Sequence, residues 1–269
     1  MATGVHRSIT VDKGVKVGLL HPGEMGASVG DALVEAGNEV FWVSEFRSKK
    51  TRERASQFTD STTMAELVGE VESIVSVCPP SEALQLARKV YGLGFRGLYL
   101  DANAIAPQTA LRISDLFADA YVDGGLIGPP ARQRGTTRLY LSGSQAEEVS
   151  SWFGGCVLEA KILAGTGVEA SSLKMAYAGY TKGMSALLLL INALAQKLGV
   201  REGLEEEWSI SQRGLVERSK HAARGTAPKA WRFVGEMEEI QKTLKSVGLP
   251  SEFHEGAAQI YKLMTDLKD

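Results

Sequence analysis

The chain has too few cysteines and histidines to build a site that depends on them. Its two cysteines, Cys78 and Cys156, make neither a disulfide framework nor a metal cluster. Its four histidines are scattered along the chain without the spacing of metal ligands. The lack of a disulfide framework favours a reducing compartment. We therefore expect a cytoplasmic protein that holds no metal.

Long apolar runs and an excess of one charge are missing as well. The apolar run at residues 186–195 is short and interrupted by Asn192, so it does not predict a membrane span. The first 14 residues have no apolar core of signal-peptide length. Thirty Lys and Arg against 32 Asp and Glu give a net charge of -2, so no overall field recruits nucleic acid. These features predict a soluble protein without a membrane or nucleic-acid partner.

What is present is an ordinary globular composition over 269 residues, with 44% hydrophobic and 23% charged residues. The first half alternates short apolar runs with helical patterns, which is typical of a parallel sheet wrapped by helices. The expected strands are 15–20, 40–43, 74–77, 98–100 and 121–122, with 139–142 and 157–164 completing the sheet at its far edge. The expected helices are 27–36, 51–58, 64–69 and one that begins at Ser81 as N-cap.

The second half has no strand pattern. A long helical pattern without proline runs from 171 to 198, and helical segments follow at 204–220, 228–247 and 252–267. We therefore predict two domains, an α/β domain at residues 1–165 and an all-α domain at residues 166–269, joined by the long helix.

The first strand ends in a glycine-bearing turn that predicts dinucleotide binding. Gly23 lets the backbone approach a pyrophosphate, and Gly26 lets the following helix pack closely on the strand. His21 stands where the first glycine of such a fingerprint usually is. The predicted cofactor contacts are His21, Pro22, Gly23, Glu24, Met25 and Gly26. The alternative is a strand-to-helix turn that holds no ligand.

The end of the second strand bears on the choice between NADP and NAD. Glu45 suits the ribose hydroxyls of NAD, whereas a 2′-phosphate needs the guanidinium of Arg47 and the hydroxyls of Ser44 and Ser48. We favour NADP because Arg47, Ser48 and Lys49 fall together. NAD stays open, and so does the view that this is only a solvated basic helix start.

Several motifs together resemble the β-hydroxyacid dehydrogenase superfamily, which also includes 6-phosphogluconate dehydrogenase and the imine reductases. The motifs are His21–Gly26, Cys78–Pro80, Asp101–Pro107, Asp123–Gly128 and Leu173–Met175, and residues 230–240 resemble a C-terminal helical domain of unassigned function. The resemblance implies a Rossmann-type nucleotide-binding domain followed by helices, and a homodimer through the helical domain. It adds Cys78, Pro79 and Asn103 to the expected cofactor contacts.

The resemblance also implies a catalytic lysine, and Lys174 occupies its place on the interdomain helix. A lysine ammonium donates a proton and charge to a developing alkoxide during carbonyl reduction and accepts a proton in the reverse direction. The family's asparagine one turn later is missing, and Tyr177 or Thr181 is its candidate substitute. Lys182 points about 80° away from Lys174 by the helical period and is ranked far below it.

The expected substrate site lies between Asn103, the strand-end glycines Gly124 and Gly125, and the helix of Lys174. Ile127 replaces the serine that usually holds a substrate carboxylate, and isoleucine cannot donate a hydrogen bond. A simple 3-hydroxy acid is therefore a less suitable substrate. The sequence predicts an NADP-dependent oxidoreductase that acts on a small alcohol or carbonyl. The alternatives are an imine reductase of the same fold and a dinucleotide-binding protein without turnover.

Overall fold

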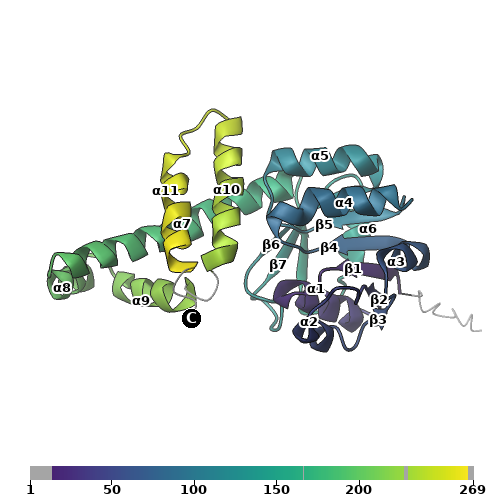
Figure 1. Cartoon of the computed structure of the whole chain (residues 1–269), viewed down its shortest axis with the longest axis horizontal. Helices are drawn as coiled ribbons and strands as arrows, with labels where there is room; N and C mark the ends of the chain where they lie inside the picture. Colours follow the sequence, from purple (N-terminus) through teal and green to yellow (C-terminus); the bar gives the residue numbers. More distant parts are fainter. Residues whose placement is uncertain (1–13, 166, 227–229, 266–269) are drawn as a thin grey trace, which may run out of the picture.

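The computed structural model describes residues 14–165, 167–226 and 230–265, and within them one sheet of eight strands forms the first half (Figure 1). Its strands are β1 Lys16–Leu20, β2 Glu39–Trp42, β3 Thr59–Asp60, β4 Ser73–Ser76, β5 Leu98–Asp101, β6 Tyr121–Ile127, β7 Arg138–Ser142 and β8 Glu159–Ile162. The strand order is β3-β2-β1-β4-β5-β6-β7-β8. Neighbours pair in parallel except β6 and β7, which are antiparallel.

The order of the strands creates a switch point between β1 and β4. The chain builds outward from β1 to β3 and then returns to place β4 on the other side of β1. Crossovers on either side of this point run over opposite faces of the sheet, so their loops part at the carboxyl ends of β1 and β4. Ligands of open α/β sheets bind in the crevice formed there.

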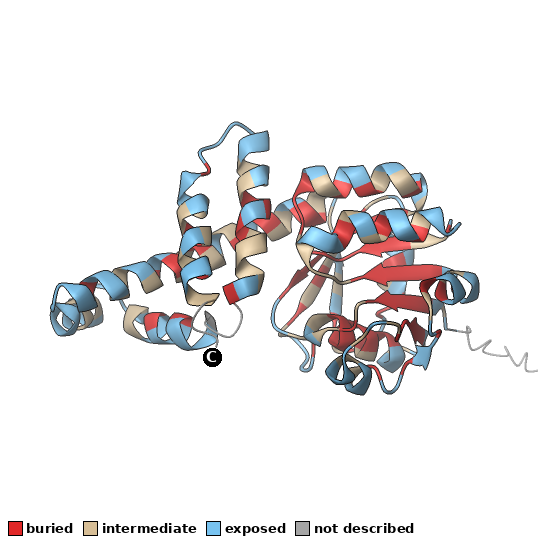
Figure 2. Ribbon diagram, in the orientation of Figure 1, coloured by how far each residue is buried: buried red, intermediate tan, exposed pale blue. Residues whose placement is uncertain are grey.

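Helices cover both faces of the sheet, which confirms the predicted Rossmann-type fold. They are α1 Glu24–Glu35, α2 Lys49–Arg54, α3 Met64–Glu70, α4 Ala83–Gly92, α5 Pro107–Phe117 and α6 Ala146–Ser151, with 3₁₀ turns η1 Pro80–Glu82 and η2 Ala118–Ala120. Apolar residues of α1 and α6 share one core cluster with the sheet, and those of α3, α4 and α5 share the other. Both faces of the sheet are therefore buried (Figure 2).

The remaining elements are all helical, as predicted. They are α7 Glu169–Lys197, α8 Arg201–Ser211, α9 Leu215–Thr226, α10 Ala230–Ser246 and α11 Glu252–Thr265. Figure 1 shows α7 running from the sheet through the helical part, with α10 and α11 packed side by side on it. A third core cluster joins these helices around Met175, Met237 and Tyr261.

Several local expectations were wrong. The helix expected at 204–220 is two helices, because Gly214 adopts a left-handed φ of 77° between α8 and α9. Ser81 does not cap a helix: it lies inside η1, and α4 follows Glu82, which makes no side-chain cap. The elements β3, α5 and α6 were not predicted. The expected helix limits Pro228 and Leu267 fall outside the described residues.

Two carboxylates link the helical part of the molecule to the α/β part. Asp123 of β6 accepts hydrogen bonds from the backbone N–H and the hydroxyl of Ser171, in the first turn of α7, at 2.7 and 2.5 Å. Glu239 of α10 accepts hydrogen bonds from the backbone N–H of Ala106 and the hydroxyl of Thr109, at the N terminus of α5, at 2.7 and 3.3 Å. Neither helix has a side-chain cap from its own N-cap residue. Each part of the molecule thus supplies a carboxylate that accepts a backbone N–H at the start of a helix in the other part.

Among the described helices, α7 is long and apolar enough to cross a membrane by length and composition alone. Its most apolar 18-residue window has a mean hydropathy of 1.2 and is 33% buried. The apolar run at residues 186–195 is shorter than this helix, so it did not indicate a candidate span in the sequence. In the structure α7 packs against β6, α9, α10 and α11.

Candidate active site

The predicted phosphate-binding turn joins β1 to α1. The helix begins at Glu24, three residues earlier than expected, and Gly23 is an N-cap without a side-chain hydrogen bond. A β-carbon on Gly23 would meet nothing within 4 Å, so the outer side of the turn is open to a ligand. A β-carbon on Gly26 would lie 2.5 Å from the carbonyl oxygen of His21, so this position requires glycine. The turn therefore fits a pyrophosphate at the start of α1.

The other residues of the turn have different surroundings. Pro22 is buried, and Met25 is partly buried with its carbonyl accepting from the hydroxyl of Ser28. Glu24 is exposed and lies 3.7 Å from Arg54 and 3.7 Å from Arg232 of α10. Their predicted contacts with a cofactor stay predictions.

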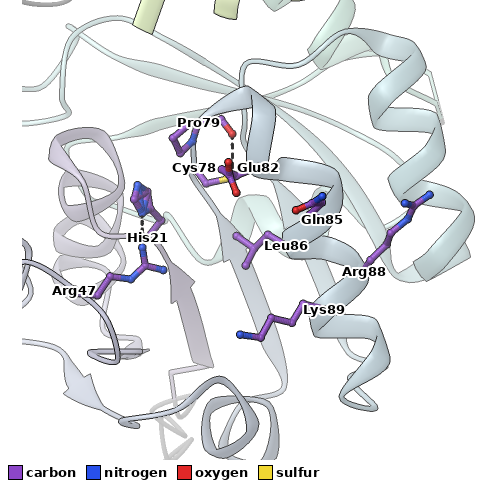
Figure 3. A pocket seen from close by; sticks show the side chains of 9 residues that line it. All are labelled: His21, Arg47, Cys78, Pro79, Glu82, Gln85, Leu86, Arg88 and Lys89. Carbon is purple, nitrogen blue, oxygen red and sulfur yellow. Dashed lines mark hydrogen bonds between the residues drawn. The ribbon is translucent and has the colours of Figure 1, made fainter. Parts of the chain in front are cut away.

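A cavity of about 720 Å³ opens beside this turn, at the switch point of the sheet (Figure 3). Its lining residues are His21, Arg47, Cys78, Pro79, Glu82, Gln85, Leu86, Arg88 and Lys89. It therefore brings together four of the predicted cofactor contacts from three separate loops. Sequence reasoning missed the residues contributed by η1 and α4. The signal was present, since positions 82, 85, 86 and 89 recur at helical spacing after the Cys78–Pro80 motif.

Of the four residues expected at the ribose, only Arg47 lines the cavity. Ser44 is buried, and Glu45 donates its backbone N–H to Thr62. The hydroxyl of Ser48 accepts from the backbone N–H of Thr51 and thereby caps α2. Roles for Ser44, Glu45 and Ser48 at a bound nucleotide stay predictions.

The side chains of His21 and Arg47 are joined. One terminal nitrogen of the guanidinium donates to Nδ1 of His21 at 2.8 Å. Burial, and then the charge of Arg47, lower the pKa of His21 to about 4, so its ring is neutral at pH 7 and able to accept. Burial, and then the nearby Asp101, raise the pKa of Cys78 to about 12, which keeps this thiol protonated and unreactive.

Asn103 is buried and links two strand ends. Its side-chain oxygen accepts from the backbone N–H of Cys78 at 2.6 Å, and its amide nitrogen donates to the hydroxyl of Ser76 at 3.0 Å. The side chain therefore holds the end of β4 against the end of β5. Its predicted contact with cofactor or substrate stays a prediction.

Lys174 lies on the second turn of α7 and points back to the sheet. Its ammonium donates to the carbonyl of Leu126, near the end of β6, at 2.6 Å. Burial, and then the charge of Lys182, lower the pKa of Lys174 to about 8, while Glu236 acts in the opposite direction. An amine with that pKa exchanges protons readily near neutral pH, as a general acid or base requires.

The glycines of β6 allow this close approach. A β-carbon on Gly125 would lie 2.6 Å from the carbonyl oxygen of Ala170 and 3.4 Å from the β-carbon of Lys174. A β-carbon on Gly124 would lie 2.9 Å from the carbonyl oxygen of Asp101. Both glycines are thus required for packing, and their predicted contact with substrate stays a prediction.

The two candidate substitutes for the missing asparagine differ in exposure and bonding. Tyr177 is 46% exposed, whereas the hydroxyl of Thr181 donates to the carbonyl of Tyr177 within the helix. Sequence reasoning missed the group beside them: Lys182 forms an ion pair of 2.6 Å with Glu236 of α10. No spacing within α7 could have revealed a partner from another helix.

Comparisons with known proteins agree with this architecture. Residues 195–264 match a family described as a domain of unknown function, DUF1932. An uncharacterized 28.5 kDa protein encoded in the 7S RNA 5′ region of Methanothermus fervidus is 27% identical over 241 residues, which are 87% of this chain and 93% of that protein. The conserved protein MTH1747, of unknown function and structurally similar to 3-hydroxyacid dehydrogenases, matches at a TM-score of 0.70 with 28% identity, covering 94% of this chain and 97% of that one.

Two more distant structures share the fold. A 3-hydroxyisobutyrate dehydrogenase from Salmonella typhimurium has a TM-score of 0.70 at 15% identity, covering 94% of this chain and 95% of that one. A reductive aminase from Aspergillus terreus, solved with NADPH and ethyl levulinate, has a TM-score of 0.58 at 15% identity, covering 94% of each chain. The expected resemblance is confirmed: the chain has the fold of the β-hydroxyacid dehydrogenase superfamily. The residues that match DUF1932 lie mostly in its helical C-terminal region.

Proposed function

We propose that the protein is an NADP-dependent oxidoreductase that transfers hydride between the nicotinamide and a small alcohol or carbonyl. The observation that carries this proposal is the arrangement of two features along one edge of the sheet. The cation-lined cavity lies at the ends of β1, β2 and β4, and Lys174 lies at the end of β6. A dinucleotide is an extended ligand that crosses the carboxyl ends of such strands.

The residues present fit such a cofactor. The open turn at Gly23 and the first N–H groups of α1 suit the pyrophosphate. Arg47 suits a 2′-phosphate, and its Nε is buried without a hydrogen-bond partner within the described structure. Glu45, the residue that favours NAD, does not line the cavity. These observations support NADP over NAD.

Lys174 supplies the proton chemistry. When bound, the nicotinamide supplies or takes up the hydride. Protonated Lys174 donates a proton to the substrate oxygen in reduction, and the neutral amine takes it back in oxidation. The carbonyl of Leu126 holds the ammonium in place. Since Ile127 ends β6 as a buried apolar side chain, we propose a substrate other than a simple 3-hydroxy acid; turnover of 3-hydroxyisobutyrate at rates usual for its dehydrogenases would refute this.

The test begins with titration of NADPH and NADH against the wild type, Arg47→Ala and Lys161→Ala, monitored by tryptophan fluorescence. Lys161 is exposed on β8, away from the cavity, and serves as the control. We expect NADPH to bind more tightly than NADH, and only Arg47→Ala to lose that preference. Consumption of NADPH with a panel of carbonyls, lost in Lys174→Ala, completes the assignment. If neither nucleotide binds, the oxidoreductase proposal fails.

One observation favours a second candidate, an imine reductase. Tyr177 presents an exposed phenol one turn after Lys174, where it provides an alternative proton donor. Lys174→Ala that loses carbonyl reduction but keeps imine reduction would support this candidate. Tight NADPH binding without turnover of either substrate class would instead indicate a dinucleotide-binding protein that is not an enzyme.

We further propose a homodimer in the cytoplasm, formed through the helical part. Exposed apolar side chains recur every three or four residues along one face of α7 and at its C-cap, namely Leu187, Leu190, Leu194 and Leu198. A stripe of this length on the described surface suits the matching helix of a second copy. The double variant Leu190→Glu/Leu194→Glu should be monomeric by light scattering, whereas Leu111→Glu, which is exposed on α5, should not change the mass.

A further inference from the structure

His21 occupies a backbone conformation that glycine adopts most easily. Its φ of 65° lies in the left-handed region, at the position where dinucleotide-binding turns usually have their first glycine. Histidine tolerates this region better than most residues but is still uncommon there. The turn therefore has a strained histidine at a position where glycine would fit without strain. Such strain calls for a role of the side chain.

The side chain of His21 holds Arg47. The left-handed backbone places the ring toward the end of β2, where Nδ1 accepts from a terminal nitrogen of the guanidinium at 2.8 Å. Because the pKa of His21 is lowered to about 4, the ring stays a neutral acceptor at pH 7. The bond is direct, and it joins the phosphate-binding turn to the ribose-binding loop.

This bond uses one donor of Arg47 and orients the others. A guanidinium carries its five donors in a rigid planar fork, so fixing one terminal nitrogen sets the direction of the remaining edge. The Nε of Arg47 is buried and has no hydrogen-bond partner among the described residues. A buried donor without a partner calls for an explanation, and an anion bound in the adjoining cavity would supply one.

The charge of the cavity identifies the ligand class. Arg47, Arg88 and Lys89 line it against one carboxylate, Glu82. Figure 3 shows His21 and Arg47 on one side of the cavity, with Lys89 and Leu86 on the side of α4. An excess of cations around an oriented guanidinium suits a phosphate monoester, whose oxygens accept two parallel hydrogen bonds from such a fork.

We propose that His21 is a positioning residue for cofactor selection: by holding one nitrogen of Arg47, it aims the guanidinium at the 2′-phosphate of NADP. The inference rests on the proposed function and deepens it. His21 acts through Arg47, so its loss weakens recognition of the 2′-phosphate and leaves recognition of the rest of the nucleotide intact.

The test uses two nucleotide fragments that differ only in this phosphate, adenosine 2′,5′-bisphosphate and adenosine 5′-monophosphate. Their dissociation constants are measured by calorimetry for the wild type, His21→Gly, His21→Asn and Arg47→Ala. Glycine accepts the φ of 65° without strain, so folding is not at risk, but it removes the acceptor. Asparagine tolerates the same backbone and offers an oxygen at the position of Nδ1.

In the wild type we expect the bisphosphate to bind more tightly than the monophosphate. His21→Gly should bind the bisphosphate about tenfold more weakly and the monophosphate with little change. A loss of this size corresponds to one charge-assisted hydrogen bond between the guanidinium and the 2′-phosphate. His21→Asn should restore the preference. His21→Gly combined with Arg47→Ala should be no weaker than Arg47→Ala alone.

Three outcomes would overturn the inference. If His21→Gly binds both fragments like the wild type, the histidine plays no part in selection, and the proposed cofactor stands. If His21→Gly weakens the binding of both nucleotide fragments equally, His21 only shapes the turn. If the wild type itself does not prefer the bisphosphate, the proposed NADP site fails together with the inference.

Discussion

The buried carboxyl of Asp101 gives the sharpest prediction about stability. It ends β5 beside Asp123, with which it is in register on β6, and it is 1% exposed. One of its oxygens accepts from the backbone N–H of Asn103, and the other has no hydrogen-bond partner within the described structure. Burial is the main cause that raises its pKa from 3.8 to about 7.

The direction of the pH effect follows from this shift. The folded state binds the proton of Asp101 more tightly than the unfolded state does, so its contribution to stability is full below about pH 4 and is lost as the pH rises through about 7. One pKa unit corresponds to about 1.4 kcal/mol. Between pH 5 and pH 8 the loss from this one carboxyl is on the order of 2–3 kcal/mol.

Asp101→Asn removes the ionisation and keeps the acceptor for Asn103. We expect wild type to lose about 2–3 kcal/mol relative to the variant between pH 5 and pH 8, measured as the change in free energy of unfolding in urea. Asp115→Asn, exposed on α5, is the control and should follow the wild type at both pH values. If Asp101→Asn shows the same pH dependence as the wild type, the carboxyl does not ionise in this range and the reasoning is wrong.

Three further predictions concern the site and the junction between the two parts. Reduction requires protonated Lys174, whose pKa is lowered to about 8, so kcat should fall about tenfold per pH unit above that value in a pH–rate profile; a flat profile there would contradict this role. Gly125→Ala drives a β-carbon into the backbone of α7 and should cost about 1–3 kcal/mol in urea unfolding and most of the turnover. Its control, Gly69→Ala, faces open space in α3 and should gain about 0.5–1 kcal/mol. Glu239→Ala removes the acceptor at the N terminus of α5 and should cost about 1–3 kcal/mol, whereas the exposed neighbour change Glu238→Ala should stay within about 0.5 kcal/mol; equal effects would show that the bonds to α5 do not stabilise the fold.

The sheet was predictable because its strands carry a local signal. Strands buried on both faces read as short apolar runs, and the turn from Leu20 to Gly26 has the glycines that close packing demands. The helix α7 was predictable for the same reason, since it has no proline over its length. The elements β3 and α6 were missed because they span only two and six residues. The helix α5 spans 11 residues and has an amphipathic pattern that begins at Pro107, so its signal was present but was not recognised.

The site was only partly predictable, because its chemistry depends on partners from distant segments. His21 was identified by its place in the turn, but no spacing indicates that its ring bonds Arg47. Lys182 lies well off the direction of Lys174 on the helix, yet it affects the pKa of Lys174 through space and pairs with Glu236. Such couplings are set by how helices pack, and one helix alone does not encode them.

The two carboxylates that reach across the junction bear on how the protein unfolds. Asp123 stays with the sheet and supports α7, while Glu239 stays with α10 and supports α5. Separating the parts would leave, on each side, a helix end without its acceptor and a carboxylate without its donors from the other part. A fragment that ends near residue 165 should therefore be less stable than expected from the apolar residues that it buries. The sequence predicts a domain boundary there, but the two parts of the molecule should melt in a single transition.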